Sequence, residues 1–179
     1  MKRGKIERGF SLIELLVVVS LLAILAVLFS SSFVAIMAGS NKAQVTSEVK
    51  QNGEYALTTI NQLIRRAKYT PMCAADGKSV DITAFDDSVV TISCDYTDAA
   101  NGNIKRIARG NNLGAYVYLT DTLVKVVDGS CKISCSTAPA SPPGVSIEFI
   151  LIQNSGSTNL RPWEQTSQKF STTTYQRNY

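Results

Sequence analysis

The stretch that decides the fold is RGFSLIELLVVVSLLAILAVLF, residues 8–29. Between Leu15 and Phe29 its only polar residue is Ser20, and the apolar character extends from Phe10 to about Ala38. A helix rises 1.5 Å per residue, so about 20 such residues span the hydrocarbon core of a bilayer. The stretch therefore predicts one membrane-spanning helix.

The residues before this stretch predict its orientation. The first nine residues hold one acid and four bases, which carry most of the chain's net charge of +4: Lys2, Arg3, Lys5 and Arg8. By the positive-inside rule they stay in the cytoplasm, which puts the rest of the chain outside it. Without them the chain is nearly neutral, so overall charge gives no argument for nucleic-acid binding. The apolar run is long for a signal peptide and no A-x-A cleavage site follows it, which leaves a plain signal anchor as the simple alternative.

Glu14 is the unusual residue of the apolar stretch. An ionisable group costs about 2–3 kcal/mol at the centre of a membrane helix and less near the interface. Two interpretations follow. The side chain reaches back to the lipid headgroups, or it pairs with a charge supplied by a partner helix.

The segment Arg8–Leu16, RGFSLIELL, resembles the processing site of type IV prepilins and pseudopilins. The resemblance implies that a prepilin peptidase cuts after Gly9 and that Phe10 becomes the N-methylated terminus. It also implies that Glu14 is needed for assembly, through a pair with the terminal amine of a neighbouring subunit. Such a pair offsets the desolvation of both charges, whereas removing one partner leaves the other uncompensated.

The resemblance implies partners and a location as well. The partners are other pilin or pseudopilin subunits, the prepilin peptidase and an inner-membrane assembly platform. The precursor is then a single-pass inner-membrane protein with its C-terminal part outside the cytoplasm, and the product is an extracellular or periplasmic filament. Many major pilins carry a proline within the apolar helix. This chain has no proline before Pro71, so no proline kink is expected.

Downstream of Ala38 the sequence predicts an amphipathic continuation of the helix. Apolar residues recur at spacings of three and four, a pattern typical of one buried stripe that packs on the protein's own sheet: Val45, Val49, Ala56, Ile60, Leu63, Ile64 and Ala67. The polar run Gly39-Ser40-Asn41 is expected to loosen the helix locally. The helix is expected to end near Pro71, and a continuous helix to Lys68 would be about 90 Å long.

Residues 71–179, the head, read as β-rich. Alternation and turn residues predict strands over Val80–Phe85, Val89–Tyr96, Ile104–Arg109, Val145–Ile152 and Gln165–Tyr175. A hairpin is expected between Tyr116–Leu119 and Leu123–Val127, and the polar stretch from Cys131 to Pro143 is expected to be a loop. The predicted fold class is α+β, a long N-terminal helix packed on a C-terminal antiparallel sheet. The predicted divisions are a leader (1–9), a transmembrane and assembly helix (10–38), its amphipathic continuation (39–70) and the head (71–179).

The head holds an even number of cysteines, which in an exported domain favours disulfides: Cys73, Cys94, Cys131 and Cys135. Four cysteines allow three connectivities. Short local loops favour Cys73–Cys94 with Cys131–Cys135. Zinc is the rival interpretation, but the chain has neither a C-x-x-C motif nor a histidine.

Signals for catalysis are lacking in the sequence. Without histidine, Ser–His and Cys–His arrangements are excluded, and there is no phosphate-binding loop. No cofactor is predicted. Asp86-Asp87 is expected to be a solvated turn. Oxygen side chains gather near one turn without the spacing of an EF-hand: Asp95, Asp98, Asn101 and Asn103.

Two basic clusters are candidates for nucleic-acid contact, although exposed cations are the simpler interpretation. One is Arg65, Arg66 and Lys68, and the other is Lys105, Arg106 and Arg109. Trp163 is expected to be a packing residue.

The sequence therefore favours a structural subunit of a type IV pilus or related pseudopilus. The alternative is a minor or tip subunit whose head binds DNA, a surface or an exported substrate. The head resembles those of minor pilins and pseudopilins loosely, in GEYALTTINQLIRRAKY, VVTISCDY and FSTTTYQRN. A signal-anchored enzyme is the third hypothesis and is disfavoured by the missing motifs.

Overall fold

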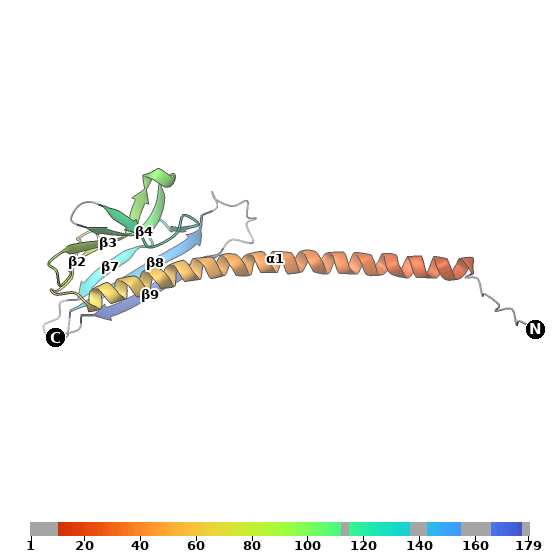
Figure 1. The fold of residues 1–179 in the computed structure, drawn as a ribbon, viewed down its shortest axis with the longest axis horizontal. Coiled ribbons are helices and arrows are strands. Elements are labelled where there is room, and N and C mark those ends of the chain that lie inside the picture. The colour runs from red at the N-terminus through yellow and green to blue at the C-terminus, as the bar shows by residue number, and fades with distance from the viewer. Residues whose placement is uncertain (1–10, 112–114, 137–142, 155–165, 177–179) are drawn as a thin grey trace, which may run out of the picture. The chain divides into compact units, whose positions relative to one another are not determined.

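The computed structural model describes residues 11–111, 115–136, 143–154 and 166–176 (Figure 1). The chain divides into two compact units, residues 1–41 and 42–179, and helix α1 (Leu12–Arg65) runs through the boundary. The strands of the described residues are β1 (Met72–Cys73), β2 (Ser79–Thr83), β3 (Val89–Asp98), β4 (Ile104–Asn111), β5 (Tyr116–Tyr118), β6 (Val124–Val126), β7 (Lys132–Ser136), β8 (Gly144–Gln153) and β9 (Ser167–Tyr175).

Helix α1 is longer without interruption than the sequence suggests. It continues through Gly39-Ser40-Asn41, so the expected loosening there is wrong. A single glycine costs only about 1 kcal/mol in a helix, which the helix formers around it outweigh. The helix ends at Arg65, a few residues before the expected end, and the backbone N–H of Lys68 then donates to the carbonyl of Thr83 at 2.8 Å.

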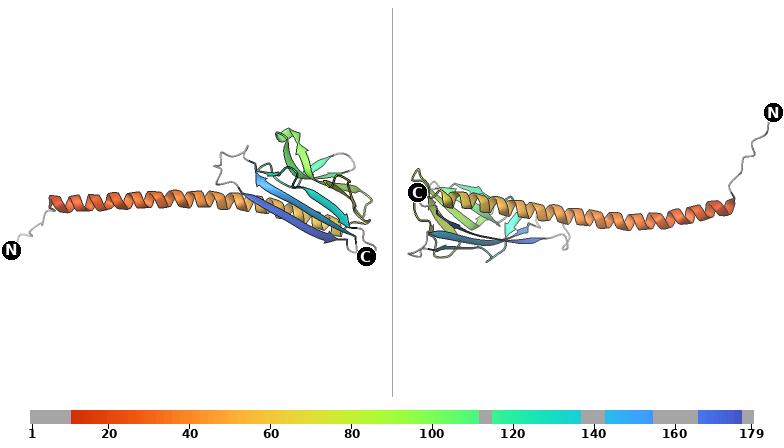
Figure 2. Two further views of the ribbon diagram at one scale, coloured as in Figure 1. Left: turned by 180° about the vertical axis from the view of Figure 1, so that it is seen from behind. Right: turned by 90° about the horizontal axis from the view of Figure 1, so that it is seen from below.

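The predicted apolar stripe of α1 is confirmed in the second unit. Its buried residues are Val45, Val49, Gly53, Ala56, Leu57, Ile60 and Ile64. Leu63 is only partly buried, whereas Gly53 and Leu57 belong to the stripe and were not expected there. In Figures 1 and 2 this part of the helix lies beside β9 and β8.

Gly53 sets how closely the helix approaches the sheet. A Cβ at this position would overlap the ring of Phe170 on β9. Phe170 in turn stacks on Phe149 of β8, with 5.5 Å between the ring centroids, and Phe149 is fully buried. The space that a side chain at position 53 would occupy is therefore filled by an aromatic ring from a strand more than 100 residues away.

The strands form two sheets instead of the single predicted sheet. The first is an antiparallel meander in the order β1-β2-β3-β4-β5. In the second, β8 pairs with β9 along one edge and with β6 and then β7 along the other, and all of these pairs are antiparallel. The inner faces of both sheets and the stripe of α1 share one apolar core.

Two local predictions for the head are wrong. The expected hairpin between Tyr116–Leu119 and Leu123–Val127 does not form, because β5 pairs with β4 and β6 pairs with β8 in the other sheet. The expected loop from Cys131 contains β7, whose alternating burial turns Ile133 into the core. Its polar residues face outward, so composition concealed a half-buried strand.

All four cysteines form disulfides, but the favoured pairing is wrong. Cys73 of β1 is bonded to Cys135 of β7, and Cys94 of β3 is bonded to Cys131, with Cα–Cα distances of 5.7 and 6.0 Å. Both bonds therefore join the first sheet to the β7 segment of the second.

Backbone geometry excludes the local pairing. Cys73 and Cys94 lie on strands separated by β2, so two strand spacings of about 4.8 Å keep their Cα atoms beyond the reach of a disulfide. Cys131 and Cys135 are four residues apart along nearly extended chain, about 13 Å. Neither local pair of cysteines can therefore come within bonding distance, whereas cysteines on facing strands of the two sheets can.

The disulfide assignment is tested by a non-reducing tryptic map, since Lys68, Lys78, Lys105, Lys125 and Lys132 separate the four cysteines into different peptides. We expect peptide 69–78 linked to the peptide that begins at Ile133, and 79–105 linked to 126–132. In the chain-entropy model, loops of 62 and 37 residues each contribute about 4 kcal/mol of stability. A link between 69–78 and 79–105 would contradict the assignment.

The packing at Gly53 predicts that Gly53→Ala destabilises the head. Alanine gains about 1 kcal/mol in helix propensity, but overpacking against Phe170 costs about 1–3 kcal/mol, so a net loss of up to about 2 kcal/mol is expected. Urea unfolding of the full chain in non-ionic detergent, followed by near-ultraviolet circular dichroism, measures it. The matched control is Gly39→Ala on the same helix, where a Cβ meets nothing within 4 Å. Equal urea midpoints for the two variants would contradict the close packing.

Candidate functional site

The N-terminus of α1 holds the first candidate residue, Glu14, in its first turn. The backbone N–H of Glu14 donates to the hydroxyl of Ser11 at 3.3 Å, so Ser11 caps the helix. The spacing S-x-x-E is that of a capping box, and an acid near a helix N-terminus is favoured by the helix dipole. Ser11 was missed in the sequence, although its spacing from Glu14 is the signal that identifies it.

The apolar half of α1 is exposed along its whole described length. Large apolar side chains from Leu12 to Met37 are between 47% and 81% exposed. This half is long and apolar enough to cross a membrane. Its serine hydroxyls are hydrogen-bonded within the helix. Those of Ser20 and Ser30 donate to the carbonyls of Val17 and Ala26, each at 2.8 Å. The predicted processing residues Gly9 and Phe10 lie outside the described residues.

The basic residues of β4 do not form one exposed cluster. Arg106 is 7% exposed, whereas Arg109 is exposed. Lys105 bridges two carboxylates, with its Nζ 2.8 Å from Oδ1 of Asp128 and 3.3 Å from Oδ1 of Asp95. These bonds, led by the one to Asp128, raise the pKa of Lys105. Because two of the three cations are held by groups of the head itself, nucleic-acid contact by Lys105, Arg106 and Arg109 stays a prediction without geometric support.

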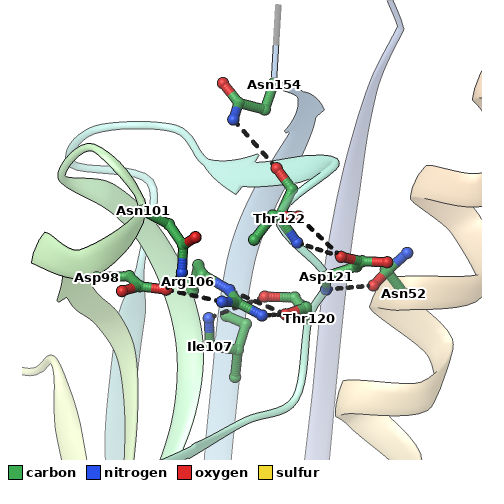
Figure 3. Close-up of polar contacts among 9 residues, drawn as sticks. All are labelled: Asn52, Asp98, Asn101, Arg106, Ile107, Thr120, Asp121, Thr122 and Asn154. Carbon is green, nitrogen blue, oxygen red and sulfur yellow. Dashed lines mark hydrogen bonds and ion pairs between the residues drawn. The ribbon is translucent and has the colours of Figure 1, made fainter. Parts of the chain in front are cut away.

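Arg106 lies at the centre of a buried polar cluster (Figure 3). Its Nη1 donates to Oδ2 of Asp98 at 2.8 Å, and its Nε donates to the carbonyl of Thr120 at 3.0 Å. Its Nη2 also donates to that carbonyl. The hydroxyl of Thr120 accepts a bond from the backbone N–H of Ile107 at 3.3 Å. The guanidinium thus bonds one carboxylate oxygen and a backbone carbonyl that are both removed from water.

The environment of Asp98 favours its charged form. The amide of Asn101 donates to Oδ2 at 2.8 Å, and this bond, followed by Arg106, lowers the pKa of Asp98 against the opposing effect of burial. The ring of Tyr118 covers the Arg106 guanidinium at 3.9 Å. Burial and a hydrogen bond to Asp98 raise the pKa of the Tyr118 phenol. Three of the oxygen side chains that the sequence grouped near this turn therefore make internal bonds, namely Asp95, Asp98 and Asn101.

The same cluster fastens the segment between β5 and β6 to the rest of the second unit. The backbone N–H of Asp121 donates to the side-chain oxygen of Asn52 on α1 at 2.7 Å. The amide of Asn154, just after β8, donates to the carbonyl of Thr122 at 3.1 Å. Residues 120–122 therefore contact the helix, the first sheet and the second sheet, as Figure 3 shows.

Other candidate residues serve as structure as well. Asp86 accepts bonds from the backbone N–H and hydroxyl of Ser88 at 3.1 and 2.6 Å, and these bonds lower its pKa. This confirms the predicted turn at Asp86-Asp87. Among the described residues, no group of three or more acids or cysteines has the geometry to hold a metal ion. Trp163 lies outside the described residues.

The lowered pKa of Asp98 predicts a dependence of head stability on pH. The charged form is favoured in the fold, so its contribution is full above the unfolded pKa, near 4, and is lost as pH falls through the lower folded pKa. Asp98→Asn is therefore expected to be less stable than the parent chain at pH 7, with the difference narrowing below pH 4. Urea midpoints from pH 7 to 3 measure it. Glu54→Gln, at an exposed position of α1, is the control, and a difference for Asp98→Asn that stays constant with pH would refute this role.

One family model matches the chain. The prokaryotic N-terminal methylation motif covers residues 4–30, and so includes Gly9, Phe10, Ser11 and Glu14 but none of the head. No significant match to the chain was found among curated proteins or among solved structures. The motif, with one long apolar helix whose second part packs on antiparallel sheets, supports the type IV pilin and pseudopilin family as the family of this chain.

Proposed function

We propose that the chain is a structural subunit of a type IV pilus or related pseudopilus, cut after Gly9, methylated at Phe10 and assembled through α1. The observation that carries the proposal is the continuous apolar surface of α1, exposed from Leu12 to Met37 behind an acid in its first turn. Such a surface is stable only in lipid or against other apolar helices. The precursor would have this surface in lipid, and a filament of parallel subunits would then cover it with other apolar helices.

The proposed divisions follow from the same reasoning. Residues 1–9 are the leader, 10–38 the transmembrane and assembly helix, 39–70 its amphipathic continuation and 71–179 the head. The precursor would sit in the inner membrane with its head outside the cytoplasm, and its partners would be other subunits, the peptidase and an assembly platform. The role is mechanical and needs no catalysis by this chain.

Glu14 has two proposed roles that must be separated. As the fourth residue of a capping box it stabilises the start of α1, which glutamine does as well. As an assembly residue it supplies a negative charge for the terminal amine of Phe10 on a neighbouring subunit, which glutamine cannot replace. In a low-dielectric filament core an unpaired amine is costly, so loss of that charge should exclude the subunit.

Glu14→Gln and Glu14→Ala together test the assembly role. We expect both variants to be cut after Gly9, which N-terminal sequencing measures. We expect the amount of each variant in sheared filaments to fall at least about tenfold, because a tenfold change corresponds to about 1.4 kcal/mol and breaking a buried charge pair costs more than that. Glu54→Gln is the matched control and should assemble normally. If Glu14→Gln assembles normally while Glu14→Ala does not, Glu14 acts through capping alone.

The alternative of a tip or minor subunit, with a head that binds DNA, a surface or an exported substrate, stays a second hypothesis. The internal bonds of Lys105 and Arg106 weaken its DNA version. Arg65 and Arg66, exposed at the end of α1, are the cations better able to meet such a ligand. DNA retention by an Arg65→Ala, Arg66→Ala double variant is compared with that of the parent chain. Weaker retention by the variant supports a DNA-binding head, and unchanged retention supports a purely structural one.

A further inference from the structure

The two disulfides of the head differ in their access to solvent. Cys94 is fully buried and its partner Cys131 is 6% exposed, and both belong to the apolar core. Cys73 and Cys135 are only partly buried and pack at the margin of that core. A thiol in solution therefore meets one disulfide at the surface and the other only after the core opens.

An open cavity of about 740 Å³ borders the partly buried disulfide. Its lining is formed by Tyr69, Thr70, Pro71, Met72, Cys73 and Cys135. Met72 is 70% exposed and Tyr69 is 56% exposed, so the rim presents apolar side chains to solvent. The volume exceeds that of a small dithiol. Thiol–disulfide exchange requires access of a thiolate to one sulfur, and both cysteines of this bond line the cavity.

The backbone around Cys73 is also weakly held. Strand β1 has two residues at the edge of its sheet, paired only at Met72 with Asp81 and at Cys73 with Val80. Cys94 lies instead within the ten-residue strand β3, where the register to β4 shifts between Ser93 and Tyr96 but the backbone N–H of Cys94 donates to the carbonyl of Lys78 at 3.2 Å. Local opening of an edge costs far less free energy than opening of a central strand.

From these observations we propose that Cys73–Cys135 is a thiol-exchange site of the head, whose reaction partner is a dithiol, and that Cys94–Cys131 is a structural bond. A thiolate of the dithiol attacks one sulfur, the Cys73–Cys135 bond breaks, and the other cysteine leaves as a thiolate that takes up a proton. The second thiol then attacks the mixed disulfide. The dithiol ends as a disulfide and both cysteines end as thiols, a two-electron transfer.

The exchange changes the head locally. It removes the covalent link between β1 and β7, while Cys94–Cys131, the shared core and the hydrogen bond from the backbone N–H of Ile133 to the carbonyl of Gly77 continue to join the two sheets. The segment from Tyr69 to Lys78, which connects α1 to β2, thereby loses its covalent tie to the second sheet. This proposal does not depend on the filament role, because it rests on how accessible each of the two disulfides in the head is to a thiol in solution.

The test is timed reduction of the full chain in non-ionic detergent with dithiothreitol, without denaturant. Exposed thiols are blocked with iodoacetamide at each time, and the remaining disulfides are then reduced and labelled with N-ethylmaleimide. The four cysteines fall on four tryptic peptides, so each is followed separately. We expect Cys73 and Cys135 to react at least about tenfold faster than Cys94 and Cys131. Equal rates or the reverse order would overturn the proposal.

Two further measurements separate access from intrinsic reactivity and from unfolding. In denaturing urea the two rates should converge, and a ratio that persists there would refute the role of the cavity. The Cys73→Ala, Cys135→Ala double variant should keep the near-ultraviolet circular dichroism of the parent chain, since its core is unchanged. If that variant loses its tertiary signal, Cys73–Cys135 is a structural bond and the proposed local exchange is wrong.

Discussion

The burial of one face of α1 against the second sheet is the interaction on which the rest of the second unit depends. The face is narrow and nearly continuous from Val45 to Ile64, and it meets β8 and β9 where Phe149 and Phe170 stack. Gly53 makes this contact close, because no side chain separates the helix backbone from the Phe170 ring. Hydrogen bonds extend the contact toward the helix end, from Thr174 to Asn61 and from Gln176 to the carbonyl of Ala67 at 2.8 Å.

The first sheet contributes to the same apolar core, and polar and covalent links supplement that contact. Arg106 holds the carbonyl of Thr120, and the next residue, Asp121, bonds to Asn52 of the helix. The two disulfides join the same sheet to β7. A buried ion pair gives little net stability by itself, but its partners are strongly penalised if they separate. The bonds of Arg106 and the buried Cys94–Cys131 disulfide therefore fix the position of the two sheets relative to each other more than they enlarge the core.

The N-terminal half of α1 differs from the second half because its apolar side chains are exposed. Its apolar surface is exposed among the described residues, and Ser11 caps the helix through a bond from the backbone N–H of Glu14. A carboxylate held at a helix N-terminus remains able to accept a second positive group, which is what assembly through a terminal amine would require.

The sequence by itself determined the long apolar helix, the methylation motif, the buried stripe of α1 and most strands, because each depends on a local run of side chains. Only the tertiary structure decided the division into two sheets, the partners of β5 and β6, the strand at β7 and the pairing of the cysteines. These features depend on which strands face each other across the core, and no local pattern encodes that. The contact of Gly53 with Phe170 and the burial of Arg106 are of the same kind, since each is set by a residue distant in the chain that fills the adjoining space.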